Sequence, residues 1–212
     1  MSVGFSKQQI AARVAADIPD GSYVNLGIGM PTAVGDALPA DKEILLHSEN
    51  GILGMGPSPA AHAVDPELIN AGKQPVTLLS GASIFHHTDS FMIMRGGHLD
   101  ICVLGGFEVS ERGDLANWST GDTTIAPAVG GAMDLAVGAK RVFVMMNHTT
   151  KDGRSKLVRE CTYPLTARRV VDRIYTDLAV LQVAEDGLHL VELAPGVSVE
   201  HLRSATEATL HV

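Results

Sequence analysis

The stretch Leu99-Asp-Ile-Cys-Val-Leu104 is apolar at every position except Asp100, and a similar run follows at Arg141-Val-Phe-Val-Met-Met146. Short, continuous apolar runs are typical of strands that are buried on both faces of a sheet. Residues 130–139, which precede the second run, have the pattern of a helix. The two runs therefore predict central strands of a sheet that helices cover on both faces.

The alternation of helices and strands continues toward both ends of the chain. Ser6-Lys-Gln-Gln9 matches a capping box, and apolar residues then recur every four positions, which predicts a helix over residues 7–18. Further strands are expected at 22–26, 43–47, 76–79, 157–158, 170–175, 178–183 and 188–193, and a hairpin at 108–115. Further helices are expected at 66–72, around 90–94 and at 198–206, and a Gly/Pro-rich loop at 48–59.

These elements predict an α/β fold. We expect one domain over residues 1–212, built on a single open mixed, mostly parallel sheet with helices on both faces and a β-rich C-terminal part. The chain shows neither an internal repeat nor a linker that would divide it.

Composition excludes several classes of protein. The chain has 212 residues, 45% of them hydrophobic, and a net charge of −8, so it is not a disordered polyampholyte. Binding to nucleic acid or to an anionic membrane is not expected, because both require clustered Lys and Arg. No apolar run approaches the roughly 20 residues of a membrane span, and no secretory signal is visible, so we expect a cytoplasmic protein.

Common cofactor motifs are incomplete. Gly27-Ile-Gly29 follows a predicted strand as in a dinucleotide-binding turn, but Thr32 stands where the third glycine is needed. The adjacent pair His86-His87 and the pair His98 and Asp100 lack a third ligand at a recognisable spacing. We therefore expect neither a metal nor a bound cofactor.

The most unusual segment is Ser48-Glu-Asn-Gly-Ile-Leu-Gly-Met-Gly-Pro57, in which Glu49 directly follows a predicted strand. Glycines allow sharp turns and close approach of a ligand, and functional residues concentrate where strands of such sheets end. Glu49 is therefore a candidate general base or covalent nucleophile, although a glutamate that only caps the turn or pairs with a lysine fits the pattern equally well.

The same segment resembles the active-site signature of the family I CoA-transferases, in particular their β subunit. The resemblance extends to seven further motifs: Tyr23-Val-Asn-Leu-Gly-Ile-Gly29, Leu68-Ile-Asn-Ala-Gly-Lys73, Met94-Arg-Gly-Gly-His-Leu-Asp100, Gly113-Asp-Leu-Ala-Asn-Trp118, Val129-Gly-Gly-Ala-Met-Asp134, Glu160-Cys-Thr-Tyr-Pro-Leu165 and Arg173-Ile-Tyr-Thr-Asp-Leu178. It implies the CoA-transferase fold and ping-pong catalysis through a glutamyl-CoA thioester on Glu49, without metal or cofactor.

The resemblance also assigns roles to other residues and implies a partner. Gly130 and Asn25 stand where the family has its oxyanion donors, and Lys73 matches a lysine near the cleft. Asn25 could instead stabilise a turn, and Lys73 could be a surface lysine. The family further implies an α subunit, with two copies of each chain in the assembly and the active site at the interface.

The substrates are less constrained by the sequence. The resemblance implies an acyl-CoA donor, usually succinyl-CoA, and a 3-oxo acid as acceptor, either acetoacetate or 3-oxoadipate. The segments 86–91 and 125–130 favour 3-oxoadipate, whose second carboxylate would need a cation that the sequence does not identify. A non-catalytic CoA-binding homologue and an enzyme of the sugar-phosphate isomerase type remain alternatives.

Overall fold

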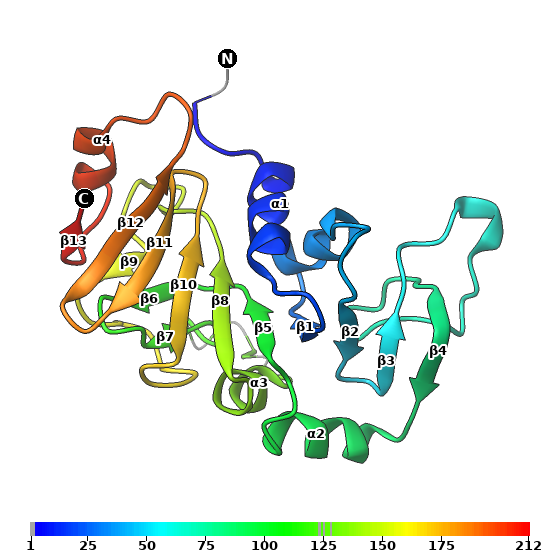
Figure 1. Cartoon of the computed structure of the whole chain (residues 1–212). Coiled ribbons are helices and arrows are strands. Elements are labelled where there is room, and N and C mark those ends of the chain that lie inside the picture. The colour runs from blue at the N-terminus through cyan, green and yellow to red at the C-terminus, as the bar shows by residue number, and fades with distance from the viewer. Residues whose placement is uncertain (1–2, 123, 125, 128) are drawn as a thin grey trace.

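The structure, a computed structural model, describes residues 3–122, 124, 126–127 and 129–212. Within these residues, ten strands form one sheet (Figure 1). From one edge to the other it contains β13 (Leu210–His211), β12 (Gly187–Leu193), β11 (Ala179–Ala184), β10 (Val171–Tyr175), β8 (Arg141–Met145), β5 (Ile101–Leu104), β1 (Tyr23–Leu26), β2 (Leu45–Ser48), β3 (Ile52–Met55) and β4 (Leu78–Ile84).

The central part of this sheet is parallel. β10, β8, β5, β1 and β2 pair in parallel, whereas β11 and β12 on one side and β3 and β4 on the other pair antiparallel. The apolar runs quoted above form β5 and β8, which are neighbours in register from Ile101 opposite Arg141 to Leu104 opposite Val144. The mixed, mostly parallel sheet predicted from the sequence is confirmed.

Helices lie on both faces of the sheet because the chain winds in two directions. The helices are α1 (Lys7–Asp17), α2 (His87–Arg95), α3 (Ala132–Gly138) and α4 (Val199–Ser204), with 3-10 helices η1 (Met30–Ala37) and η2 (Ala61–Ala63). The connection β1–η1–β2 moves toward one edge, and the connection from β5 through α3 to β8 moves toward the other. Because crossovers between parallel strands are as a rule right-handed, connections that move in opposite directions are placed on opposite faces; α1 packs on η1, and α2 packs on α3.

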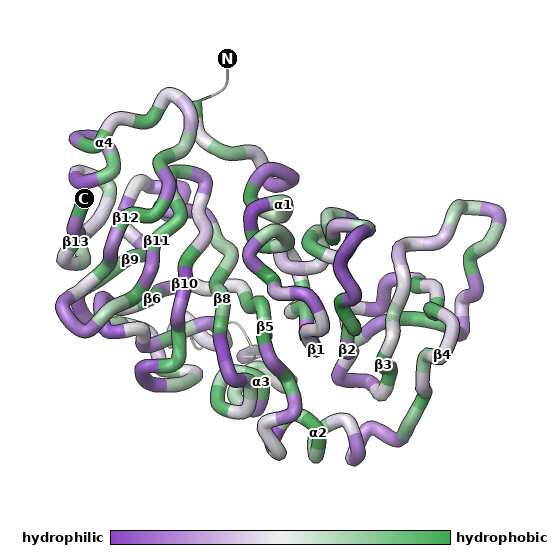
Figure 2. Tube along the Cα trace, in the orientation of Figure 1, coloured by the Kyte–Doolittle hydropathy of each residue, from purple (hydrophilic) through white to green (hydrophobic). Residues whose placement is uncertain are grey.

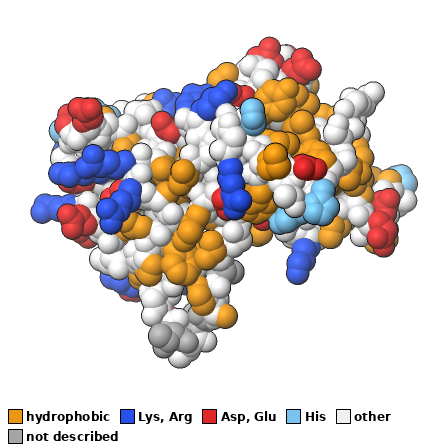
Figure 3. Space-filling model, turned by 90° about the horizontal axis from the view of Figure 1, so that it is seen from below, with side chains coloured by type: hydrophobic (Ala, Val, Ile, Leu, Met, Phe, Trp, Pro, Cys, Tyr) orange, Lys and Arg blue, Asp and Glu red, His pale blue; other side chains and the backbone are white. Residues whose placement is uncertain are grey.

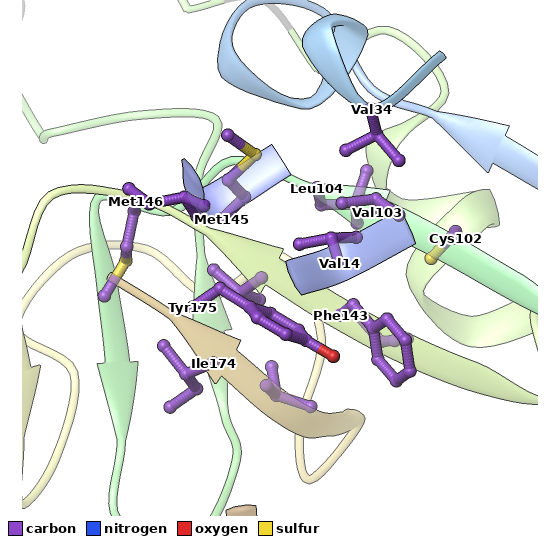
Figure 4. Close-up of a cluster of buried hydrophobic side chains, with 14 of the residues drawn as sticks. Val14, Val34, Cys102, Val103, Leu104, Phe143, Met145, Met146, Ile174 and Tyr175 are labelled. Atoms are coloured by element: carbon purple, nitrogen blue, oxygen red, sulfur yellow. The ribbon is translucent and has the colours of Figure 1, made fainter. Parts of the chain in front are cut away.

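The core forms between these layers. Val14 of α1 and Val34 of η1 meet Val103 of β5, while Phe143 of β8 packs against Tyr175 of β10 at a ring distance of 5.5 Å (Figure 4). Hydrophobic residues run along much of β5 and β8, whereas the outer turns are more polar (Figure 2). The predicted capping box of α1 is also confirmed: Ser6 Oγ accepts a hydrogen bond from the Gln9 amide at 3.2 Å, and Gln9 Oε1 accepts one from the Ser6 amide at 2.8 Å.

The region between β3 and β4 differs from the prediction. Residues 66–72 form no helix; they fold back on themselves, with a bridge between Ile69 and Pro75. The Asn70 side chain accepts a hydrogen bond from the Gln74 amide at 3.1 Å, so it competes with helical backbone bonding. The segment 48–59, predicted as a loop, contains β3, which pairs with β2.

The predicted hairpin at 108–115 is present as β6 (Glu108–Ser110) and β7 (Leu115–Ala116). β6 also pairs in parallel with β9 (Leu157–Val158), so the hairpin belongs to a small three-stranded sheet that the sequence did not indicate. Among the described residues, none of the helices has the length and apolar character needed to cross a membrane.

Candidate active site

A cavity of about 450 Å³ opens where four parallel strands end. Its lining includes residues at or just after the carboxyl ends of β1, β2, β5 and β8: Leu26, Gly27, Ile28, Ser48, Glu49, Leu104, Gly105, Gly106, Met145, Met146 and Asn147. β1 and β5 are the neighbours from which the chain winds toward opposite edges. Connections to opposite faces leave a crevice at this switch point, which is the usual ligand site of open α/β sheets.

Glu49 lies in this cavity beside the start of α3. The turn that joins β2 to β3 holds it there, and this turn requires a glycine at position 51, because φ is +113° and a Cβ would overlap the Phe85 carbonyl oxygen. A Cβ on Gly131 would overlap Oε2 of Glu49, and one on Gly130 would lie 3.9 Å from Oε1. The two glycines therefore leave the carboxylate accessible to a reacting carbon.

The surroundings of Glu49 raise its pKa. Partial burial is the largest cause and the charge of Asp134 adds to it, whereas the charge of His87 opposes them. His87 Nδ1–H also donates a hydrogen bond to the Glu49 carbonyl oxygen at 3.1 Å. A carboxylate that is poorly solvated and more basic than usual is a better nucleophile or base than an ordinary surface glutamate.

A buried hydrogen-bond chain supports the end of β2. The Asn25 amide donates to His47 Nδ1 at 3.0 Å and to the His47 carbonyl oxygen at 3.2 Å. Nδ1 therefore accepts, which places the ring proton on Nε2, 2.9 Å from Ser90 Oγ. Burial lowers the pKa of His47 to about 4, so the ring is neutral at pH 7. These hydrogen bonds fix His47, the residue before Ser48 and Glu49.

The structure brings together three of the four residues singled out from the sequence. Glu49, Gly130 and Asn25 line the cavity, although the Asn25 amide is already bonded to His47. Lys73 does not line it; its side chain is exposed, in a turn where its φ is +62°. Ile125, one of the residues used to compare acceptors, lies outside the described residues.

The sequence did not single out several other cavity residues. Gly131 belongs to the quoted motif at 129–134 but was not singled out. The signal that could have identified it is the pair of adjacent glycines at 130–131, which allows another group to approach the backbone closely. Lys156 reaches the cavity from the segment before β9, and no pattern around it marked it out. His47 and Ser90 meet across 43 positions, a pairing that periodicity does not reveal.

Metal-binding groups lie elsewhere. In the described part of the chain, one group of three candidate ligands, Asp186, His189 and His211, has its ligand atoms within 4.8 Å of one another. His189 lies on β12, His211 on β13 and Asp186 in the turn before β12, and none of the three lines the cavity. The two thiols are poor nucleophiles, because burial raises the pKa of Cys161 to about 12 and that of Cys102 further.

Seen from the side at which α2 and α3 lie, hydrophobic side chains gather around the middle of the surface, with isolated charged and histidine side chains among them (Figure 3). Met92 of α2 and Val137 of α3 are 65% and 71% exposed.

Known proteins resemble this chain along nearly its whole length. A family model described as Coenzyme A transferase matches residues 7–205. The chain is 62% identical over 205 residues to the B subunit of the 3-oxoadipate CoA-transferase of Pseudomonas putida, covering 97% of this chain and 96% of the relative. It is 47% identical over 206 residues to the B subunit of the succinyl-CoA:3-ketoacid coenzyme A transferase of Helicobacter pylori, covering 97% and 99%.

A solved structure supports the fold alone. An acyl-CoA transferase apoenzyme from Escherichia coli O157:H7 superposes with a TM-score of 0.75 at 23% identity. The match covers 100% of this chain and 42% of that longer chain, so the present chain corresponds to less than half of that neighbour.

Proposed function

We propose that this chain, which belongs to the coenzyme A transferase family, is a catalytic β subunit that moves CoA from succinyl-CoA to 3-oxoadipate through Glu49. Membership of the family makes the chain a CoA-transferase. The observation that carries the residue assignment is the position of Glu49, whose carboxylate faces Gly130 and Gly131 in the switch-point cavity.

In the first half-reaction, a Glu49 carboxylate oxygen attacks the thioester carbonyl carbon of succinyl-CoA. The C–S bond breaks, CoA leaves as a thiolate, and a mixed anhydride joins Glu49 to the succinyl group. The thiolate then attacks the glutamyl carbonyl carbon, the anhydride C–O bond breaks, and succinate leaves. The product is a Glu49–CoA thioester.

In the second half-reaction, the acceptor carboxylate runs the same steps backward and leaves as its CoA ester. The acyl group stays activated as a thioester or anhydride throughout, so the exchange is near thermoneutral and needs neither metal nor ATP. A serine ester would lose this activation, which explains why a carboxylate is required.

Each attack creates a tetrahedral oxyanion that needs donors already in place. We assign one donor to the backbone N–H of Gly130, where the absence of a Cβ leaves room for the reacting carbon. Asn25 contributes through His47, because its side-chain amide is committed to that ring. Lys73 is exposed, and its proposed role is to attract CoA rather than to touch the reacting atoms.

Similarity supports the choice of substrates and partner. The relatives named as B subunits of 3-oxoadipate CoA-transferases are 60–62% identical to the chain, whereas those named for 3-ketoacids are 46–47% identical. Because these relatives are named as B subunits, we propose an α subunit as partner. We further propose two copies of each chain per assembly, which the family resemblance implies, and a cytoplasmic location.

Mass spectrometry of the complex tests the proposal. After succinyl-CoA is added, the peptide that contains Glu49 should gain the mass of CoA less water, and 3-oxoadipate should remove it. Glu49→Ala should abolish both the adduct and turnover, while Glu67→Ala, a change of an exposed glutamate, should abolish neither. Full turnover in Glu49→Ala would contradict the assignment and favour a non-catalytic, CoA-binding role.

A further inference from the structure

We propose that Lys156 is a carboxylate-binding subsite in the same cavity, which holds the second carboxylate of dicarboxylic substrates. The inference rests on the proposed function and adds to it the cation that a dicarboxylic acceptor needs. In this arrangement the reacting carboxyl group of the substrate lies at Glu49, and its other carboxyl group lies at Lys156.

The cavity contains one acid and one cation at separate places. Among the described residues that line it, Glu49 and Lys156 are the only ones that carry a charge at pH 7. The charges that perturb Glu49 are those of His87 and Asp134, and Lys156 is not among them. Among the described residues Lys156 forms no ion pair with Glu49, so it leaves the nucleophile free.

A neutral group holds the Lys156 ammonium in place. Its Nζ donates a hydrogen bond to the Gly106 carbonyl oxygen at 2.7 Å, directly after β5. In the described ranges, no carboxylate forms an ion pair with it. Since an ammonium has three N–H groups and this bond uses one, the side chain is oriented and its charge is not neutralised.

Burial prepares this cation for an anionic ligand. Desolvation lowers the pKa of Lys156, and the charge of Asp177 only partly offsets that effect. A substrate carboxylate that displaces the remaining water from a half-buried ammonium gains a stronger interaction than it would at the surface. Asn147 also lines the cavity and offers a neutral polar group, whereas the Asn117 side chain, which lines it too, donates to the Gly105 carbonyl oxygen and accepts from the Thr166 hydroxyl.

The second half-reaction gives the cleanest test, because it separates the acceptor from the donor. The complex is loaded with CoA from succinyl-CoA, succinate is removed, and loss of the Glu49–CoA adduct is followed with 3-oxoadipate or acetoacetate. In Lys156→Met, the apparent second-order rate constant should fall about 30- to 100-fold for 3-oxoadipate and less than about 3-fold for acetoacetate. Lys156→Arg, which retains the charge, should recover part of the loss.

Controls distinguish recognition from structural damage. Lys151→Met changes an exposed lysine in the turn five residues before Lys156 and should leave both rate constants unchanged. Loss of the Lys156 bond to Gly106 could also disturb the cavity, but such damage would slow both acceptors. Equal losses for the two acceptors, or no loss for either, would overturn the subsite.

A binding measurement tests the Lys156 subsite even if CoA transfer does not proceed through Glu49. Adipate, which has two carboxylates and no 3-oxo group, should bind the complex at least 10-fold more tightly than butyrate, and Lys156→Met should remove this preference. An unchanged preference would overturn the subsite, whereas the absence of a CoA adduct in the unmodified complex would contradict only the proposed function.

Discussion

The close approach of Gly131 to Glu49 constrains the reacting carboxylate at the scale of single residues. A methyl group on Gly131 has no space, because it would coincide with the Glu49 carboxylate. We expect Gly131→Ala to displace the carboxylate and lower kcat by about 100-fold or more, since 1 Å of misplacement is sufficient for such a loss. The stability of the chain should change by less than about 1 kcal/mol, because the methyl group points into the cavity.

Steady-state kinetics and urea unfolding of the same preparations measure both quantities. Gly35→Ala is the matched control, because its methyl group would meet only leucine side chains at ordinary contact distances of 3.5 and 3.6 Å. Normal kcat in Gly131→Ala would mean that Glu49 does not need its present position.

The raised pKa of Glu49 predicts the acid side of the pH profile. Only the ionised carboxylate attacks, so kcat/KM for succinyl-CoA should fall as the pH drops through a pKa above that of an ordinary glutamate. Asp134→Asn removes a charge that raises this pKa, so it should move the acid limb to lower pH. If the acid limb of the pH profile stays at the same pH in Asp134→Asn, a group other than Glu49 controls it.

Two buried histidines predict how stability depends on pH. The folded-state pKa of His47 and of His148 is lowered to about 4, mainly by burial, whereas the unfolded value is near 6.5. Between these values the unfolded chain binds more protons, so the free energy of unfolding must decrease as the pH falls from 6.5 toward 4. Each histidine can contribute at most about 3 kcal/mol to this decrease.

Urea unfolding at several pH values tests this dependence. His148→Asn should reduce the slope of stability against pH, while His62→Asn, which changes an exposed histidine, should leave the slope unchanged. Equal slopes in all three proteins would show that His148 is not kept neutral by the fold.

At the scale of elements, the fit of α3 against α2 determines where the glycine pair lies. Gly138, the last residue of α3, packs so closely on α2 that a Cβ would overlap the Met94 carbonyl oxygen. Gly138→Ala should push the helices apart and destabilise the chain by about 1–3 kcal/mol. The neighbouring change Val137→Ala, at a side chain that is 71% exposed, should stay within about 0.5 kcal/mol. Equal urea midpoints for the two variants would contradict this packing.

Predictability differed between elements for physical reasons. The predicted strands at 99–104 and 141–146 and the capped helix at 7–18 were confirmed, because apolar runs and capping boxes act locally. The predicted helix at 66–72 was wrong because Asn70 bonds to the turn and residues 69–75 pair with each other. β3 was missed because its glycines resemble a loop, although the β2 edge offers a partner for it.

At the scale of the whole molecule, topology brings the cavity residues together. Glu49, Gly130 and Lys156 come from three distant segments and line one cavity, which opens where β1 and β5 start connections to opposite faces. The glycine-rich surroundings made Glu49 a candidate, and family resemblance pointed to Glu49 and Gly130. It could not identify Lys156, because the parallel pairing of β6 with β9 that brings this residue to the cavity joins segments far apart in the chain.

The charge of the whole molecule leads to the last prediction. CoA carries several phosphate charges, yet the chain has a net charge of −8, and Lys156 is the single cation among the described lining residues. We therefore expect the isolated chain to bind CoA esters weakly and to show no transfer above that of Glu49→Ala. Addition of the α subunit should restore activity, and light scattering should show an assembly with the mass of two copies of each chain. Full activity of the purified chain alone would contradict the need for a partner, and an active assembly of another size would contradict only the stoichiometry.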